Sequence, residues 1–310
     1  MGPLMIRILK SFAFLTLIGQ SLSACADTGQ NSAACLSSDI TVKDMERAKA
    51  NAFETLDTRA KANMATSMVA CLGHPDPAIR DGIAYAGLTA LLRSGTLPQD
   101  DIRALRDQLL VIVETNDADG YSAPFAALVL SEVARTDRVE PYLTDSEFDQ
   151  LVQAAATYVN GVTDYRGFSD TEGWRHGIAH GADWLMQLSL NPALTDDHAN
   201  ILLKAIQTQI PSGNGHIYIH GEPGRLARPV LFIAMQQGRS EQAWTEWLAP
   251  LIDPAPMSEW GEAYKSEAGL ARLHNVKSFL QALYVAASLS SNTEVKPLID
   301  PVTEALRALP

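Results

Sequence analysis

Apolar residues recur three or four positions apart along most of the chain, which is the spacing of one face of an α-helix. After Asp76-Pro77 they form a single stripe over residues 79–91. An Asp before a Pro is typical of a helix cap followed by a first-turn proline, so a helix is expected to begin there. Thr144 with Glu147 three positions later has the pattern of a capping box, which predicts a helix to about Val159.

The same spacing continues to the C-terminus, and no convincing run of alternating apolar residues predicts a strand. Leu97-Pro98 starts a second helix, and the turn at residues 117–120 separates it from a third. Further helices are expected over residues 170–190, 196–210, 222–237, 240–252, 267–290 and 294–308. Helices of this length with short connections are typical of antiparallel pairs stacked side by side. We therefore predict a single all-α domain over residues 39–310, an α-α superhelix similar to HEAT repeats; a closed ring of helices is the competing architecture.

The first 25 residues have a different pattern. Arg7 and Lys10 precede a short uncharged apolar run, and Leu22-Ser23-Ala24-Cys25 follows it. A basic start, a short apolar stretch and small residues before a cleavage site are typical of a signal peptide. The last four residues resemble the bacterial lipobox, so residues 1–24 are expected to be removed and Cys25 to be lipidated. Ordinary secretion after cleavage at an alanine is the alternative.

An acylated Cys25 would hold the protein firmly in a membrane, because each buried methylene contributes about 0.8 kcal/mol. Residues 25–38 are small and polar and are expected to form a flexible tether. Ala26, where an Asp would favour retention in the inner membrane, favours the periplasm-facing outer membrane in a cell with two membranes. If Cys25 carries lipid, Cys35 and Cys71 remain, and in an oxidising compartment they are either disulfide-bonded or two unpaired thiols.

The charge of the chain narrows the range of partners. The 310 residues include 24 Lys and Arg against 36 Asp and Glu, a formal net charge of -12 that becomes about -14 once residues 1–24 are removed. A chain this acidic repels phosphate backbones, so nucleic-acid binding is not expected. The expected partners are the membrane, through the lipid anchor, and an envelope protein or peptide.

The densest group of polar residues lies in the helix expected over residues 170–190. At about 100° per residue, four side chains share one face of that helix: Glu172, His176, His180 and Asp183. The rest of its circumference is mostly apolar. Because a helix with apolar residues on nearly every side is usually buried, this polar strip must meet partners inside the protein or line a cavity.

Three interpretations of the two histidines are open. They are hydrogen-bonded structural residues, an organic-ligand site, or ligands of a metal such as zinc with Asp183 as an oxygen ligand. Gly177 occupies the position where the metalloprotease helix has its glutamate, so the general base of that mechanism is missing. Gly173, Gly177 and Gly181, spaced four apart, indicate the close approach of a neighbouring helix or of a ligand.

A second polar group lies in residues 213–225, which contain four glycines. Loops on a rigid helical scaffold are a common place for sites, but the Lys and Ser of a phosphate loop are missing, which argues against nucleotide binding. Arg225 is expected to pair with Asp183 or Glu222 or to bind a ligand carboxylate. The full set of candidate ligand-binding residues is Trp174, His176, His180, Asp183, His220, Glu222 and Arg225.

One motif, Trp-x-His-x-x-x-His-Gly-Ala-Asp from Trp174 to Asp183, carries a family resemblance together with several other segments. Those segments are residues 76–92, 126–130, 165–168, Glu222 with Arg225-Leu226, and 275–284. In the same order, over roughly residues 70–290, they resemble the bacterial family known as domain of unknown function 2785. The resemblance implies a helical fold and places the family motif at Trp174, His176, His180, Asp183 and Arg225. It implies no activity, and the lipobox is a departure from the family pattern.

Two hypotheses on function follow. The first is a non-catalytic, membrane-anchored helical scaffold whose concave surface binds a peptide, a glycan or an envelope protein. The second is a hydrolase-type enzyme that uses His176, His180 and Asp183, with or without a metal. The sequence contains no Gly-x-Ser-x-Gly nucleophile motif, and a lipidated Cys25 cannot act as a nucleophile.

Overall fold

The computed structural model describes residue 35 and residues 40–115, 117–212 and 215–310. Within these residues the regular structure is helical, except for a short hairpin of strands β1 (Phe168–Ser169) and β2 (Gly173–Trp174). The predicted all-α class is confirmed. No helix in the described part of the chain is long and apolar enough to cross a bilayer. The predicted signal peptide, Cys25 and all of the predicted tether except Cys35 lie outside the described residues.

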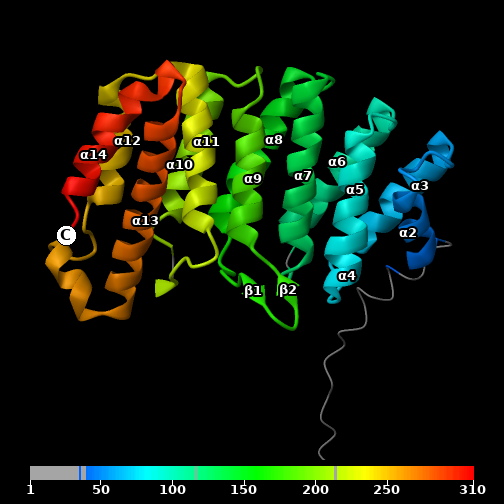
Figure 1. The fold of residues 1–310 in the computed structure, drawn as a ribbon, viewed down its shortest axis with the longest axis horizontal. Coiled ribbons are helices and arrows are strands. Elements are labelled where there is room, and N and C mark those ends of the chain that lie inside the picture. Colours follow the sequence, from blue (N-terminus) through cyan, green and yellow to red (C-terminus); the bar gives the residue numbers. More distant parts are fainter. Residues whose placement is uncertain (1–34, 36–39, 116, 213–214) are drawn as a thin grey trace, which may run out of the picture.

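The helices stand side by side in two rows, and successive long helices alternate in direction (Figure 1). The first row contains α4 (Pro77–Ile79), η1 (Arg80–Tyr85) and α5 (Ala86–Arg93) as one continuous helix, then α7 (Ser122–Val139), α9 (Gly177–Ser189), α11 (Glu222–Gln237) and α13 (Glu267–Leu289). The second row contains α6 (Gln99–Glu114), α8 (Asp145–Gly161), α10 (Asp196–Gln209), α12 (Glu241–Ile252) and α14 (Lys296–Arg307). Helices α2 (Val42–Ala50) and α3 (Thr58–Ala70) precede the rows, and η3 (Trp260–Lys265) and η4 (Thr293–Val295) are short 3-10 helices.

Each helix packs mainly against its neighbours in the array. Along the first row α7 packs on α9, α9 on α11 and α11 on α13, while in the second row α8 packs on α10. In Figure 1 the blue N-terminal helices and the red C-terminal helix lie at opposite ends of the array. The architecture is therefore an open stack of antiparallel helix pairs, as predicted, and the closed ring of helices is wrong.

The predicted start signals do cap helices. The Asp76 side chain accepts a hydrogen bond from Ala78 N (2.8 Å), and Pro77 occupies the first turn of α4. Thr144 and Glu147 form the predicted capping box at the start of α8. From residue 196 onward, each predicted helix is found within two residues of its predicted bounds.

The helix predicted over residues 170–190 is wrong at its start. Residues 168–174 form the hairpin instead, and α9 begins only at Gly177. The turn depends on Gly173, whose φ of 72° lies in the left-handed region that glycine enters at little cost. Two backbone hydrogen bonds extend the pairing beyond the strands: Arg175 N to Gly167 O (2.9 Å) and His176 N to Arg166 O (3.0 Å).

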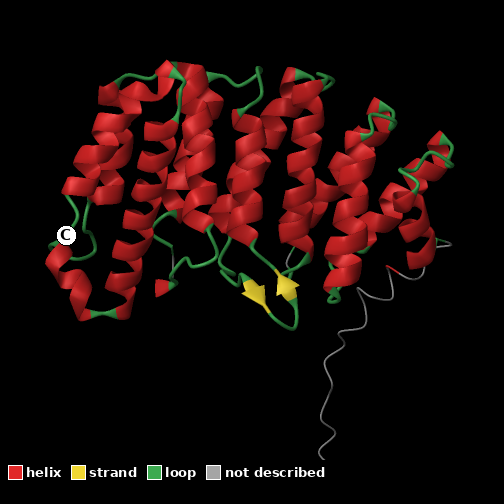
Figure 2. Cartoon of the chain, viewed as in Figure 1, coloured by secondary structure: helices red, strands yellow, loops and turns green. Residues whose placement is uncertain are grey.

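The first-row helices α4, α7, α9 and α11 all begin at one edge of the array, the lower edge in Figure 1. We call it the N-terminal edge and define it as the segments that precede these helices: residues 71–76, 117–121, 162–176 and 215–221. The hairpin, yellow in Figure 2, lies on it. Because parallel neighbouring helices begin there, the edge brings together segments far apart in the sequence.

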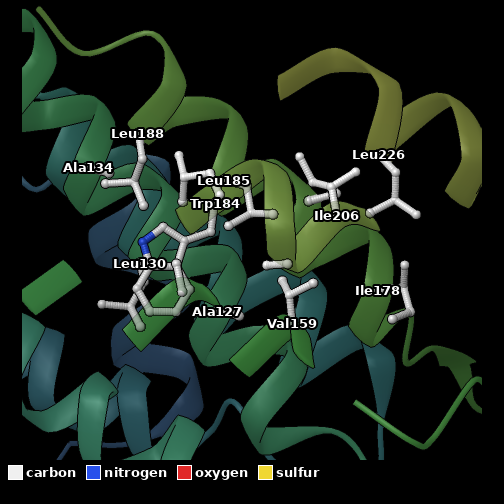
Figure 3. Packing of buried hydrophobic residues seen from close by; sticks show 14 of the residues in the cluster. Ala127, Leu130, Ala134, Val159, Ile178, Trp184, Leu185, Leu188, Ile206 and Leu226 are labelled. Atoms are coloured by element: carbon white, nitrogen blue, oxygen red, sulfur yellow. The ribbon is translucent and has the colours of Figure 1, made fainter. Parts of the chain in front are cut away.

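Helix α9 is the most enclosed element of the first row. Eleven of its 13 residues are buried, and Trp184 is completely so. Figure 3 shows Trp184 within the apolar cluster to which α7, α8, α9, α10 and α11 all contribute. Burial of each large apolar side chain stabilises the fold by about 1.5–3 kcal/mol. The prediction that this helix is enclosed on nearly every side is confirmed.

A disulfide joins Cys35 to Cys71, the residue that ends α3, with 4.7 Å between the two Cα atoms. Both cysteines are fully buried. The bridge spans a sequence separation of 36 residues, and closing a loop of that length contributes about 4 kcal/mol in the chain-entropy account. The sequence left open whether Cys35 and Cys71 are disulfide-bonded or two unpaired thiols, and in the structure they are bonded.

Two glycines let α8 and α9 approach each other closely. A Cβ atom added at Gly181 would lie 2.7 Å from Val159 Cγ2 and 3.0 Å from Tyr158 Cε1, and one at Gly177 would lie 3.3 Å from Tyr158 Oη. Glycine at these positions is therefore explained by the close approach of a neighbouring helix, as predicted. Gly173 has a different role, since it lies in the hairpin.

The substitution Gly181→Ala tests this packing. We expect it to lower the free energy of unfolding by about 1–3 kcal/mol, because the added methyl overlaps Val159 in a filled interface. Urea unfolding followed by circular dichroism measures the change. The control is Gly224→Ala in α11, where an added Cβ meets nothing within 4 Å, so stability should stay the same or rise. A Gly181→Ala protein as stable as the parent would show that α8 and α9 are not closely packed.

Candidate functional site

Four aromatic rings and one carboxylate meet at the centre of the N-terminal edge. We call this set the imidazole cluster and define it as Trp174, His176, His180, His220 and Glu222. The Trp174 and His176 rings stack, with centroids 4.6 Å apart and 22° between their planes. The His176 centroid lies 5.8 Å from that of His180 and 6.2 Å from that of His220. Five of the seven predicted ligand-binding residues therefore lie together, although they come from β2, α9 and the start of α11.

His176 connects the hairpin to α9 in an unusual backbone conformation. Its φ of 58° and ψ of 39° lie in the left-handed region, which few residues other than glycine adopt. Such a conformation costs about 1–3 kcal/mol and persists only where the surroundings impose it. Here the hydrogen bond to Arg166 O and the stacking on Trp174 hold the residue in place.

Glu222, the first residue of α11, is the acidic member of the cluster and is only 2% exposed. Its Oε2 accepts a hydrogen bond from His220 N (2.8 Å). Its Oε1 lies 3.8 Å from His176 Nε2 and 3.7 Å from His220 Nδ1. Both distances are too long for hydrogen bonds, so these two buried ring nitrogens have no hydrogen-bond partner among the described residues.

His180 is held by helix α7. Its Nδ1 lies 3.2 Å from the carbonyl oxygen of Pro124, which can only accept, so Nδ1 carries the proton. The ring also meets Phe125 edge to face at 5.0 Å between centroids. These contacts fix the tautomer and the orientation of the ring, a structural role in which His180 joins α9 to α7.

Burial keeps the two central histidines neutral. Desolvation lowers the pKa of His176 to about 4, with further lowering by the charges of Arg225 and His220. Desolvation lowers the pKa of His180 to about 3, with a smaller contribution from His176. At neutral pH both imidazoles are therefore uncharged, and each offers one hydrogen-bond donor and one acceptor.

Asp183 lies outside the imidazole cluster, in an ion pair with Arg225 that joins α9 to α11. The sequence left open whether Arg225 pairs with Asp183, pairs with Glu222 or binds a ligand carboxylate. In the structure it pairs with Asp183. Burial raises the pKa of Asp183, and Arg225 opposes that rise. The pair satisfies a carboxylate that would otherwise be buried without a partner.

Glu172 does not share a helix face with the two histidines, because it lies in the turn of the hairpin. Its carboxylate pairs with Arg175 instead (2.7 Å). Within the described residues, no group of three or more His, Cys, Asp or Glu side chains is arranged to hold a metal ion. The described residues therefore supply no third ligand for the zinc interpretation of His176 and His180.

Arg80 is a structural centre of the edge that the sequence analysis missed. Its side chain is fully buried, and it donates to the carbonyl oxygens of His74 (3.1 Å) and Glu172 (2.9 Å). Its guanidinium carbon lies 4.3 Å from the centroid of the Tyr121 ring and 4.9 Å from that of Phe125. It thus connects three segments of the edge. The available signal was an arginine within the apolar stripe over residues 79–91.

Gly167 is a second missed residue, because it makes room for His220. A Cβ atom at Gly167 would lie 2.1 Å from His220 Nδ1, so the imidazole packs directly on the glycine backbone. The loop that carries His220 is held in place by hydrogen bonds to Asn275, which is fully buried in α13. Its side chain bonds three groups of that loop, Tyr218 N, Ser212 Oγ and His216 O, each at 2.9 Å.

A cleft of about 580 Å³ opens between α6 and α8, and no sequence motif predicted it. We call it the α6–α8 cleft. The residues that line it are Leu110, Val113, Glu114, Thr115, Asp117, Gly120, Ala123, Pro124, Gln150, Gln153, Ala154, Thr157, Tyr158, Gly161, Val162, Thr163, Asp164, Arg175 and Gly177. Arg175 and Gly177 flank His176, and Pro124 binds His180. The imidazole cluster is therefore next to one end of the cleft.

The buried histidines predict how stability depends on pH. Their folded pKa values lie below the usual value of 6.5, so below that pH the unfolded chain binds more protons and stability falls as pH falls. Between pH 7 and pH 5 each histidine should contribute roughly 2 kcal/mol of this loss. We expect His180→Gln, measured by urea unfolding at both pH values, to lose about 2 kcal/mol less than the parent. Equal losses in the two proteins would show that His180 is not kept neutral.

Comparison with known proteins identifies a family. A family model described as "Protein of unknown function (DUF2785)" matches residues 109–285, more than half of the chain, and this range includes the hairpin, the imidazole cluster and the α6–α8 cleft. Searches of curated proteins and of solved structures find no match. The chain therefore belongs to the DUF2785 family, the family that the motif from Trp174 to Asp183 indicated.

Proposed function

We propose that the protein is an exported, lipid-anchored binding protein that holds its ligand in the α6–α8 cleft. The observation that carries the binding part of this proposal is the cleft itself. Its volume of about 580 Å³ lies in the range of pockets that enclose small organic ligands. Its walls combine apolar side chains such as Leu110 and Val162, which can bury the body of a ligand, with polar ones such as Gln153 and Thr157, which can orient it.

Two observations support export. The first 25 residues have the sequence pattern of a lipoprotein signal ending at Cys25. The disulfide between Cys35 and Cys71 is a bond that persists in oxidising compartments and is rare in the cytosol. With Cys25 acylated, nine residues would separate the lipidated cysteine from Cys35 of the disulfide, which would keep the binding domain close to a membrane surface.

The geometry favours binding over the hydrolase alternative. That alternative needs His176, His180 and Asp183 to act on one substrate atom. Asp183 is engaged by Arg225, and Nδ1 of His180 is engaged by Pro124 O. The imidazole cluster is better explained as a rigid framework that fixes the segment at one end of the cleft.

The anchor is tested by Cys25→Ser. In a bacterial host, we expect the parent protein in the membrane fraction, released only by detergent, because two or more acyl chains bind durably. The Cys25→Ser protein should leave that fraction, and intact-mass measurement should show no lipid. A parent protein recovered without lipid in the soluble fraction would exclude the anchor, while leaving the binding site open to the separate test below.

The binding site is tested by filling the cleft. Thr157 is exposed on its wall, so Thr157→Trp should block a ligand without disturbing the core. The matched control is Thr208→Trp, at an exposed position of α10 outside the cleft. In thermal-shift screening against cell-wall fragments and small metabolites, a true ligand at 100 times its Kd stabilises the native state by about 2.7 kcal/mol.

We expect that stabilisation in the parent and in Thr208→Trp, and its loss in Thr157→Trp. Ligands that stabilise all three proteins equally would place the binding site elsewhere, and the proposal would fail.

A further inference from the structure

We propose that the α6–α8 cleft selects a small organic cation, an ammonium group carried on an apolar body. This inference rests on the proposed function and names the chemical class of the ligand. Three features of the cleft support it: the charges on its walls, the partners that those charges already have, and the apolar surface between them.

The one basic side chain on the described walls of the cleft, Arg175, is already neutralised. Its Nη1 donates to Glu172 Oε2 (2.7 Å), and its Nε donates to the backbone oxygen of Asp119 (2.8 Å). Its guanidinium carbon also lies 4.2 Å from the centroid of the Tyr121 ring. With a carboxylate, a carbonyl and an aromatic face as partners, Arg175 offers little to an anionic ligand.

The three acidic side chains on the walls are only partly neutralised. Asp164 pairs with Arg166, which offsets part of its charge. Asp117 accepts hydrogen bonds from the backbone N–H groups of Gly120 and Ala123, which carry no net charge. Glu114 is exposed, and none of the ion pairs among the described residues includes it. Among the residues that the structure describes, the carboxylates of Glu114 and Asp117 therefore have no cationic partner, and both lie at the α6 end of the cleft.

The Tyr158 side chain on the inner wall of the cleft is close enough to two of these carboxylates to be affected by their charge. Burial raises the pKa of the Tyr158 hydroxyl, and the charges of Asp117 and Asp164 raise it further. Burial disfavours any charge at this wall, but the carboxylates act by sign: they disfavour a ligand anion and favour a cation. The formal net charge of -12 for the whole chain acts in the same direction, because it increases the local concentration of cations.

The apolar part of the cleft determines what kind of cation fits. Leu110 and Val113 on α6 face the same cavity as Ala154 and Val162 on the α8 side, with Pro124 also on its wall. A hydrated inorganic ion cannot use this surface. An amine on a hydrocarbon or aromatic body can bury the body against it and place the charge near Glu114 and Asp117.

Three probes of similar size and shape separate charge from hydrophobicity: 2-phenylethylamine, which is cationic, 2-phenylethanol, which is neutral, and phenylacetate, which is anionic. Their Kd values are measured by titration calorimetry on the parent, Glu114→Gln, Thr157→Trp and, as a matched control, Glu140→Gln. Glu140 is exposed and lies outside the cleft. It follows the C-terminal end of α7, whereas the cleft is lined by residues at the N-terminal end of that helix.

We expect the amine to bind at least fivefold more tightly than the alcohol, and phenylacetate to bind most weakly. Glu114→Gln should reduce that preference about fivefold, Glu140→Gln should leave it unchanged, and added salt should weaken the amine alone. Thr157→Trp should abolish binding of the amine.

Equal or tighter binding of the alcohol or of phenylacetate, lost in Thr157→Trp, would overturn the cation preference and leave the cleft as a binding site. Failure of all three probes on the parent would also overturn the cation inference. The screen described above would then decide separately whether the cleft binds any ligand.

Discussion

The backbone reversal before α9 is the constraint on which the rest of the N-terminal edge depends. Two backbone hydrogen bonds, from Arg175 N to Gly167 O and from His176 N to Arg166 O, hold the reversed chain against the preceding segment before α9 begins. The reversal directs the Arg175 side chain toward the cleft, stacks His176 on Trp174, and brings Gly167 against His220. Without it, neither the imidazole cluster nor the wall of the cleft would have its present shape.

Several polar groups of the edge and of the helices that begin there are satisfied by contacts between helix pairs. Arg80 binds a carbonyl group 92 residues later in the chain, Asp183 on α9 pairs with Arg225 on α11, and His180 on α9 contacts the carbonyl group of Pro124 on α7. In a stack where each pair has an apolar interface with its neighbours, such contacts set the relative position of the pairs. They leave few polar groups uncommitted, and the ring nitrogens beside Glu222 are among these few.

Much of the fold could be predicted from the sequence, because helix periods and caps are local. The capping box at Thr144 and the helix over residues 222–237 needed nothing beyond a few neighbouring residues. The same local rule was wrong at residues 170–176, since helical spacing alone cannot show that Gly173 adopts a positive φ or that residues 166–167 pair with residues 175–176. For the candidate site, the grouping of Trp174 with the histidines followed from the family motif. The α6–α8 cleft did not, because it depends on how far apart two helices lie, a distance that no motif encodes.

The disulfide between Cys35 and Cys71 has a mechanical consequence. Any tension on the chain before residue 35 is transmitted through a covalent bond to the end of α3, at one extremity of the open array (Figure 1). The point of load is therefore fixed on the body of the protein, and the early helices between the two cysteines are shielded from the pull. The opposite extremity, with α12, α13 and α14, remains free to swing through the largest arc around that attachment.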